Sequence, residues 1–312
     1  MKHRFRSLAL GLLGLLVLAS AASAASAAPH HKAAPKPNPA KGVLLSLGDS
    51  YSVGWQELPG GTQGSTHNGP ADQLVPLAAA RGWHLKLVNF GCGGATTTSM
   101  LTASSVGCDP RALAPGAANY PNESQTQAAV AFIKSHPNQV KVVTISIGGN
   151  DVDGCPTQPD PTGCVKANMP KATKNLTKIV KQLRAAGGEQ MRIIGSTYPD
   201  VELGLWVHPT ALGANTLALV PGSISAFQDD INPGLRKAYD TVGAAFVDVT
   251  KATGAYGPFI ATIDPAFGQI PVPVAKVCTL TYFCDGTFNI HMKTPGYHII
   301  AALEANTLPR LK

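Results

Sequence analysis

Short apolar segments alternate with longer helical patterns along most of this chain. The clearest short segment is 141–147, KVVTISI, which is rich in β-branched residues and almost wholly apolar. A strand of that composition is typical of the centre of a parallel sheet, where helices cover both faces. The alternation therefore predicts an α/β fold, a doubly wound parallel sheet whose ligands bind beyond the carboxyl ends of the strands.

Five strands and five helices are expected. The strands are 43–47, 84–89, 141–147, 191–196 and 245–249, and the helices are 71–80, 124–135, 170–186, 224–241 and 294–307. Because no repeat or change of composition follows residue 41, the sequence indicates a single domain over 42–312. The segment 203–228 has no charged residue and 252–277 is similarly apolar. We interpret each as either a packed loop or an apolar wall of a binding cleft.

The N-terminal segment, residues 1–28, has the order of a secretory signal peptide. A basic start is followed by the apolar run 8–18 and by small residues with two Ala-Ser-Ala sites. Residues 29–41, PHHKAAPKPNPAK, then predict a flexible tether. We therefore expect a secreted, extracellular protein.

The composition excludes several other classes of protein. Charged residues make up 14% and hydrophobic residues 44%, which argues against a disordered chain or a coiled coil. The run 8–18 is shorter than the ~20 apolar residues that cross a bilayer, so no integral membrane segment is expected. The net charge is +7, but no basic patch is interleaved with aromatic residues, so we expect no nucleic-acid binding.

Six cysteines in an exported chain favour disulfide bonds. They fall into three local couples, and loops close most readily between neighbours. A zinc site is the alternative, but no C-x-x-C pair or H-x-x-x-H cluster accompanies them. The sequential pairing is therefore preferred: Cys92 with Cys108, Cys155 with Cys164, and Cys278 with Cys284.

Residues that suit acyl transfer follow three of the predicted strands. Ser50, in Gly-Asp-Ser, could serve as a nucleophile. Glycines 91, 93 and 94 could let a main-chain N–H approach a ligand, and the Asn150 amide could donate to an oxyanion. His291, just before the last helix, is the candidate base. Each motif alone is also typical of a tight turn, but the set supplies nucleophile, donors and base at one end of the sheet.

In these four blocks the chain resembles the SGNH, or GDSL, hydrolases, which are serine esterases and lipases on a flavodoxin-like sheet. The blocks occur in the family's order, and the resemblance covers residues 42–309. It implies Ser50 as nucleophile, the glycine of the second block at Gly94, the asparagine of Gly-x-Asn-Asp at Asn150, and the histidine at His291. Ser50, Gly94 and Asn150 would then form the oxyanion hole.

One departure from the family pattern concerns the third catalytic group. The family has Asp-x-x-His, but Phe288 stands three residues before His291, and Asp285 stands six before it. A loop anchored by a Cys278–Cys284 bridge could still bring Asp285 to the imidazole and complete a triad. Alternatively, a backbone carbonyl could orient His291 in a Ser/His dyad.

We therefore expect a secreted carboxylic ester hydrolase that works through a Ser50 acyl-enzyme. The apolar segments favour lipid or fatty acyl esters as substrates. A carbohydrate O-acetylesterase is the enzymatic alternative, and a catalytically silent binding module is the alternative of another class. The chemistry needs no metal or organic cofactor, and we expect a monomer whose partner is its ester substrate.

Overall fold

The computed structural model describes residues 40–311. The signal peptide and most of the tether, predicted over 1–28 and 29–41, lie outside the described residues. The last two tether residues, Ala40 and Lys41, form the start of the first strand.

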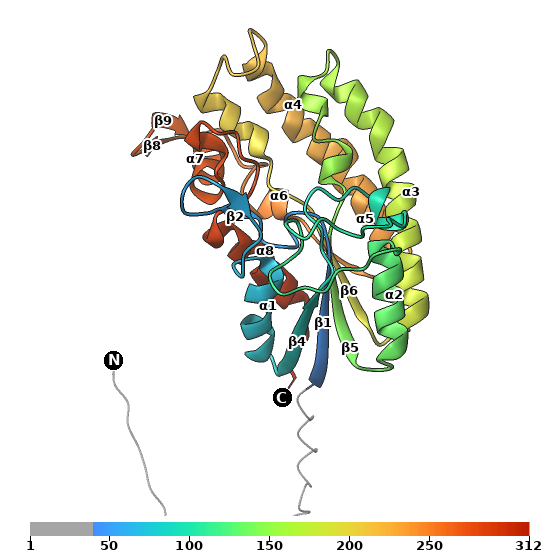
Figure 1. The fold of residues 1–312 in the computed structure, drawn as a ribbon. Helices are drawn as coiled ribbons and strands as arrows, with labels where there is room; N and C mark the ends of the chain where they lie inside the picture. Colours follow the sequence, from blue (N-terminus) through green and yellow to red (C-terminus); the bar gives the residue numbers. More distant parts are fainter. Residues whose placement is uncertain (1–39, 312) are drawn as a thin grey trace, which may run out of the picture. The chain divides into compact units, whose positions relative to one another are not determined.

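A parallel sheet of five strands forms the centre of the fold (Figure 1). Its order is β4-β1-β5-β6-β7, so the five strands, counted along the chain, lie in the order 2-1-3-4-5 of flavodoxin-like proteins. This confirms the predicted fold class. The strands are β1 Ala40–Gly48, β4 Trp83–Asn89, β5 Val140–Ser146, β6 Arg192–Ser196 and β7 Ala245–Val247.

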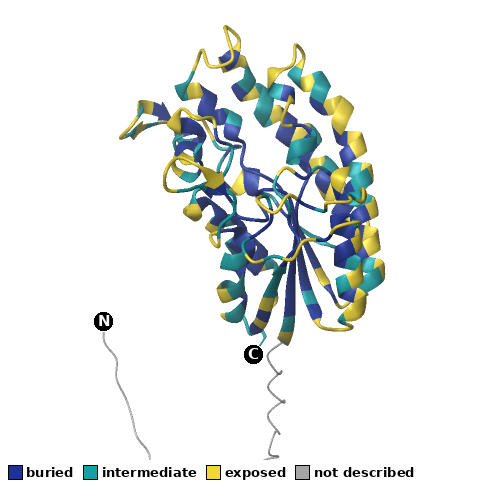
Figure 2. Ribbon diagram, in the orientation of Figure 1, coloured by how far each residue is buried: buried dark blue, intermediate teal, exposed yellow. Residues whose placement is uncertain are grey.

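Helices cover both faces of the sheet. α1 (Pro70–Ala79) and α8 (Thr294–Thr307) pack together on one face, and α2 (Gln125–Ser135), α3 (Pro161–Gly187) and α5 (Asn232–Asp240) lie on the other (Figure 1). Figure 2 shows the central strands mostly dark blue, and helices that carry yellow and teal residues as well as dark blue ones. In β1 and β5 the side chains of Leu44, Leu45, Leu47, Val142, Val143 and Ile145 have no exposed surface. Apolar side chains on both faces of the central strands thus form the core.

Smaller elements lie above the carboxyl ends of the strands. They are the pair β2 (Gln56–Glu57) and β3 (Gln63–Gly64), the pair β8 (Ala261–Asp264) and β9 (Gly268–Pro271), and the helices α4 (Leu219–Ala226), α6 (Val249–Ala252) and α7 (Val272–Leu280). No helix among residues 40–311 is long and apolar enough to cross a membrane.

Two predicted helices differ from those observed. α3 begins at Pro161 rather than at residue 170, because the Asp160 side chain accepts a hydrogen bond from Gly163 N at 2.9 Å and caps the helix there. Pro170 lies inside α3 instead of starting it. The helix expected over 224–241 is α4 and α5 joined by one π-helical turn, Phe227–Ile231.

Three disulfides link the cysteines as the sequence predicted. Cys92 pairs with Cys108, Cys155 with Cys164, and Cys278 with Cys284. The second bridge joins the 3₁₀ turn Cys155–Thr157 to the first turn of α3.

Candidate active site

Ser50 follows β1, at the place where the order of the strands reverses. The next strand along the chain, β4, lies on one side of β1, and the strand after it, β5, lies on the other. Such a reversal of strand order is a topological switch point, which leaves a crevice at the carboxyl ends of the strands. Gly48 has a φ of +129°, and a Cβ there would collide with the carbonyl oxygen of Ser146. The Gln125 side chain accepts a hydrogen bond from Gly48 N at 2.7 Å and donates one to Gly48 O at 3.0 Å. The glycine and these two hydrogen bonds therefore fix the turn that presents Ser50.

Asp49 stabilises the same turn through its carboxylate. Its carboxylate accepts hydrogen bonds from Tyr51 N at 3.0 Å and from the Tyr198 hydroxyl at 2.5 Å. Full burial raises the pKa of Asp49 to about 7 despite these donors. Asp151 has a similar role, because it accepts from the amide N and the hydroxyl of Thr97 at 2.8 and 2.7 Å.

The three expected oxyanion donors lie on loops that contact one another. Asn150 Nδ2 donates to Ala95 O at 2.9 Å, which uses one of its two hydrogens and places the Asn150 amide beside Gly94. Gly94 has a φ of +77°, and a Cβ there would meet open space. Within residues 40–311, the backbone N–H groups of Ser50 and Gly94 donate to no acceptor. These donors are therefore available to a ligand.

His291 is held through Nδ1 by a neighbouring amide. Asn289 Oδ1 lies 2.7 Å from His291 Nδ1 and also accepts from the His291 backbone N at 3.1 Å. Nε2 is buried and has no hydrogen-bond partner in the described part of the chain. Burial lowers the pKa of His291 from the usual 6.5 to about 4, so the imidazole is neutral at neutral pH and can accept a proton.

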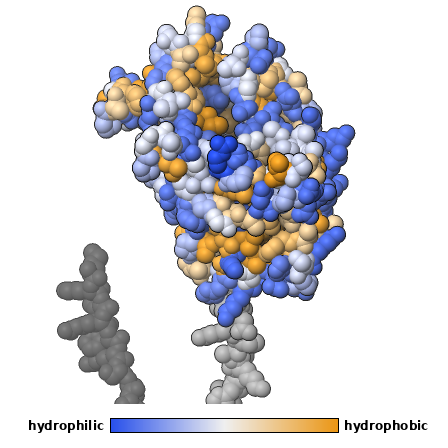
Figure 3. Space-filling model, in the orientation of Figure 1, coloured by the Kyte–Doolittle hydropathy of each residue, from blue (hydrophilic) through white to orange (hydrophobic). Residues whose placement is uncertain are grey.

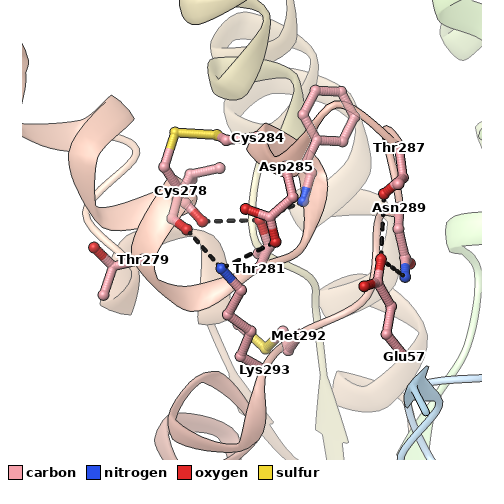
Figure 4. A network of polar contacts seen from close by, with 12 residues as sticks. Glu57, Cys278, Thr279, Thr281, Cys284, Asp285, Thr287, Asn289, Met292 and Lys293 are labelled. Atoms are coloured by element: carbon pink, nitrogen blue, oxygen red, sulfur yellow. Dashed lines mark hydrogen bonds and ion pairs between the residues drawn. A yellow bond between two sulfur atoms is a disulfide. The ribbon is translucent and has the colours of Figure 1, made fainter. Parts of the chain in front are cut away.

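Asp285 does not lie at the imidazole, in contrast to the triad expected from the sequence. Its carboxylate pairs with Lys293 Nζ at 3.3 Å, on the other side of the loop from Asn289 (Figure 4). The Cys278–Cys284 bridge and a 3₁₀ turn, Phe283–Asp285, hold it there. Asn289, two residues before His291, contacts the imidazole instead. The partner of Nδ1 is a side-chain amide, not the backbone carbonyl of the alternative dyad.

The loops that carry Ser50 and His291 are joined by hydrogen bonds between distant parts of the chain. Tyr51 Oη donates to Ile290 O at 2.6 Å, and Gln56 Nε2 donates to Met292 O at 3.0 Å. Tyr297 Oη, on α8, donates to Trp55 O at 2.8 Å. The residues directly after Ser50 and on both sides of His291 are thus fixed to one another.

A cavity of about 680 Å³ opens beside Ser50. Its lining includes Asn150 and Ile290 from the site, and most of the other lining residues are apolar. They come from the segment 152–159 and the start of α3, from the turns after β6, from the loop before α4, and from α4 and the π-helical turn, for example Val165, Val201, Leu212, Leu219, Phe227 and Ile231. Figure 3 shows a hollow in the upper half of the molecule with hydrophobic residues beside it.

The two apolar segments singled out in the sequence have different roles. Segment 203–228 supplies lining residues of the cavity, including Leu212, and also packs into a small cluster through Leu203 and Leu205. Segment 252–277 contributes no lining residue and packs around α7. Only the first segment is therefore a wall of the cavity.

Two carboxyl groups lie close together at the cavity. Glu202 lines it, and Asp200 accepts from the Ser223 hydroxyl at 2.9 Å behind it. Burial, followed by the repulsion from Glu202, raises the pKa of Asp200 well above its usual range, and burial also raises the pKa of Glu202. Both carboxyl groups are therefore protonated more readily than an exposed carboxyl group.

Sequence reasoning missed two residues of this site. Asn289 could have been found from the sequence. In an Asx turn, the side-chain oxygen of an asparagine accepts a hydrogen bond from the backbone N–H two residues later, and His291 stands at that spacing from Asn289. Glu57, which contacts Asn289, lies 232 residues earlier in the chain. No local pattern indicates such a pair.

The fold and the site define an α/β ester hydrolase of the SGNH type. The family model described as GDSL-like Lipase/Acylhydrolase matches residues 46–299, and the chain belongs to this family. No curated protein matches the chain significantly in sequence.

Several solved structures of ester hydrolases are similar to this chain. An aryl esterase from M. smegmatis is 13% identical, with a TM-score of 0.47, over 88% of this chain and 100% of that chain. A carbohydrate acetylesterase family member from Sinorhizobium meliloti is 14% identical, with a TM-score of 0.44, over 85% and 96%. The lipase Lip_vut3 from a goat rumen metagenome is 14% identical, with a TM-score of 0.46, over 86% and 99%.

Proposed function

We propose that this protein is a secreted serine ester hydrolase in which Ser50 is the nucleophile and His291 the general base. The observation that carries the proposal is the state of His291, a neutral imidazole whose buried Nε2 is unpartnered within the described chain. It stands on a loop hydrogen-bonded to the loop of Ser50. Asn289 rather than Asp285 takes the place of the third catalytic group, because Asn289 holds Nδ1.

The reaction follows from these roles in two steps. His291 Nε2 accepts the Ser50 hydroxyl proton as Oγ attacks the ester carbonyl carbon, and the carbonyl electron pair moves onto oxygen. The oxyanion accepts hydrogen bonds from Ser50 N, Gly94 N and Asn150 Nδ2. The C–O bond to the alcohol then breaks, and the alcohol leaves with the proton from His291. Water, deprotonated by the same nitrogen, attacks the acyl-enzyme and releases the acid and the Ser50 hydroxyl.

An ester with an apolar acyl chain is the substrate class that the cavity favours. A volume of about 680 Å³ is within the range of cavities that enclose whole small-molecule ligands, and apolar residues predominate in its lining. Burial of an acyl chain there would remove it from water. We therefore propose lipid or fatty acyl esters.

A carbohydrate O-acetylesterase is the second candidate, favoured by a different observation. Glu202 and Asp153 line the same cavity, and carboxylates accept hydrogen bonds from sugar hydroxyls. An acetyl group would occupy little of the apolar volume, which is why we place this function second.

The test is hydrolysis of a series of nitrophenyl esters, from acetate to palmitate, by the wild type and by Ser50→Ala. We expect activity that rises with acyl length and falls at least ~1,000-fold in the variant, whose fold is retained. Activity confined to acetate would favour the carbohydrate esterase. Near-native activity of Ser50→Ala would contradict the assignment, and no hydrolysis of any ester would favour a silent binding module.

Export is part of the proposal. The N-terminal pattern 1–28 and the three disulfides support it, because disulfides persist in oxidising compartments. N-terminal sequencing of the protein from culture medium should find a chain that begins after residue 28. A protein retained in the cell with residue 2 or Met1 at its N-terminus would contradict export.

A further inference from the structure

A chain of hydrogen bonds continues from His291 beyond Asn289 to a carboxylate. Asn289 Nδ2 donates to Glu57 Oε1 at 3.2 Å, and the Thr287 hydroxyl donates to the same oxygen at 3.2 Å. Figure 4 shows Thr287 and Asn289 both directed at Glu57, while Asp285 is directed at Lys293. Glu57 lies on β2, and Asn289 is 6% exposed.

The groups at the two ends of this hydrogen-bonded series, the His291 backbone N–H and the Glu57 carboxylate, set the direction of each hydrogen bond that Asn289 makes. A backbone N–H can only donate, so the Asn289 atom beside His291 N is the amide oxygen. The amide NH₂ therefore faces Glu57, which as a carboxylate can only accept. Since the amide oxygen also faces Nδ1, the Nδ1 atom of His291 carries its hydrogen, and Nε2 has the free lone pair that a base needs.

A neutral amide performs only part of what an aspartate does beside a catalytic histidine. It holds the tautomer and the ring orientation, but it adds no negative charge. It can also rotate to exchange oxygen and nitrogen, and the NH₂ group would then face Nδ1 and favour the wrong tautomer. The His291 backbone N–H and Glu57 both oppose this rotation, because a rotated amide would set its NH₂ group against the N–H and its oxygen against the carboxylate.

We propose that Glu57 is a positioning residue for the reaction, which keeps His291 in the reactive tautomer by fixing the orientation of the Asn289 amide. The inference deepens the proposed function and depends on it. Glu57 contacts neither the substrate nor the reacting atoms, and it acts only through Asn289. The carboxylate of this site is thus one hydrogen bond further from the imidazole than in a Ser-His-Asp triad.

Single substitutions give the first test. Glu57→Ala should lower kcat for a nitrophenyl ester about tenfold and leave KM unchanged, because it removes a charge-assisted hydrogen bond remote from the substrate. Glu57→Gln keeps an acceptor oxygen and should restore part of the loss. Glu189→Gln, an exposed carboxylate on the loop after α3, is the matched control and should leave kcat unchanged.

A double-mutant cycle gives the sharper test. In Asn289→Asp, the new carboxylate holds Nδ1 but repels Glu57, so adding Glu57→Gln should now raise kcat instead of lowering it. The acid limb of the kcat/KM profile should also move to higher pH in Asn289→Asp, because the carboxylate stabilises the imidazolium. The proposal requires both signs, a lower kcat from Glu57→Gln in the wild-type background and a higher kcat in the Asn289→Asp background, and an unchanged kcat in the wild-type background contradicts it.

A third measurement is independent of activity. ¹⁵N NMR of His291 should show hydrogen on Nδ1 in the wild type and a mixture of tautomers in Glu57→Ala. The proposal is overturned if Glu57→Ala keeps a wild-type kcat and tautomer, or if its loss of kcat vanishes when rates are corrected for the folded fraction. If the wild type hydrolyses no ester, the proposed function fails, and the NMR result still decides the role of Glu57.

Discussion

Glu304 is a carboxyl group buried in the middle of α8. It is 2% exposed, and its Oε2 atom has no hydrogen-bond partner in the described chain. Burial raises the pKa of Glu304 from the usual 4.5 to about 8, so the folded protein binds this proton more tightly than the unfolded chain. Glu304 therefore lowers the free energy of unfolding progressively as the pH rises from about 4.5 to about 8.

Glu304→Gln should remove this pH dependence, because the amide has nearly the same shape and stays neutral. We expect little change in Tm near pH 5 and an increase of at least ~5 °C near pH 9. Thermal unfolding followed by circular dichroism across this range is the measurement, with Glu189→Gln as an exposed control. Parallel Tm curves for the wild type and Glu304→Gln would contradict the prediction.

The site residues differ in how far the sequence reveals them. Ser50, Gly94, Asn150 and His291 each follow or precede a regular element with a recognisable local pattern, and the structure places their loops together. Asp285 was a reasonable candidate because only its spacing from His291 was visible. The ion pair with Lys293 that holds it away, and the contact of Asn289 with Glu57, depend on distant segments that spacing does not describe.

At the scale of elements, strands were easier to predict than helix starts. β5 was visible because burial on both faces requires an unbroken apolar run. The start of α3 was missed because Pro170 resembled a first-turn proline, whereas the Asp160 cap lies ten residues earlier. The π-helical turn between α4 and α5 had no periodic signal at all.

α4 offers a direct test of the cavity as an acyl site. Gly222 lines the cavity, and a Cβ at this residue would meet no atom within 4 Å. Gly222→Phe should therefore place an aromatic ring in the cavity and shift the preferred nitrophenyl ester to shorter acyl chains. We expect kcat/KM for the ester with the longest acyl chain to fall about tenfold. Rates across the acyl series are the measurement.

Gly222→Ala is the matched control for this substitution. It should stabilise α4 by up to ~1 kcal/mol, since alanine replaces glycine in a helix, without changing the preference for chain length. An unchanged preference in a folded Gly222→Phe would place the acyl chain elsewhere.

At the scale of the whole molecule, the site depends on contacts between the two ends of the described chain. Tyr297→Phe removes the hydrogen bond to Trp55 O and leaves that carbonyl without this donor. The free energy of unfolding should therefore fall by about 1–2 kcal/mol. Tyr51→Phe should lower the free energy of unfolding by a similar amount. The kcat of both variants should also fall, because each loses one hydrogen bond that joins the segment after Ser50 to the segment around His291. Denaturant unfolding and kcat measured on the same samples test this, and an unchanged kcat in both variants would contradict it.

The distance of Ser50 from His291 along the chain also has a consequence for biogenesis. Ser50, the proposed nucleophile, is synthesised early, but His291, the proposed base, and α8 come more than 240 residues later. A chain still emerging from the ribosome would therefore carry Ser50 without the imidazole that is proposed to accept its proton. Under the proposed function, hydrolysis should accordingly be the last property to return on refolding, after the sheet has formed, and an unfinished chain should hydrolyse no ester in the cell that makes it.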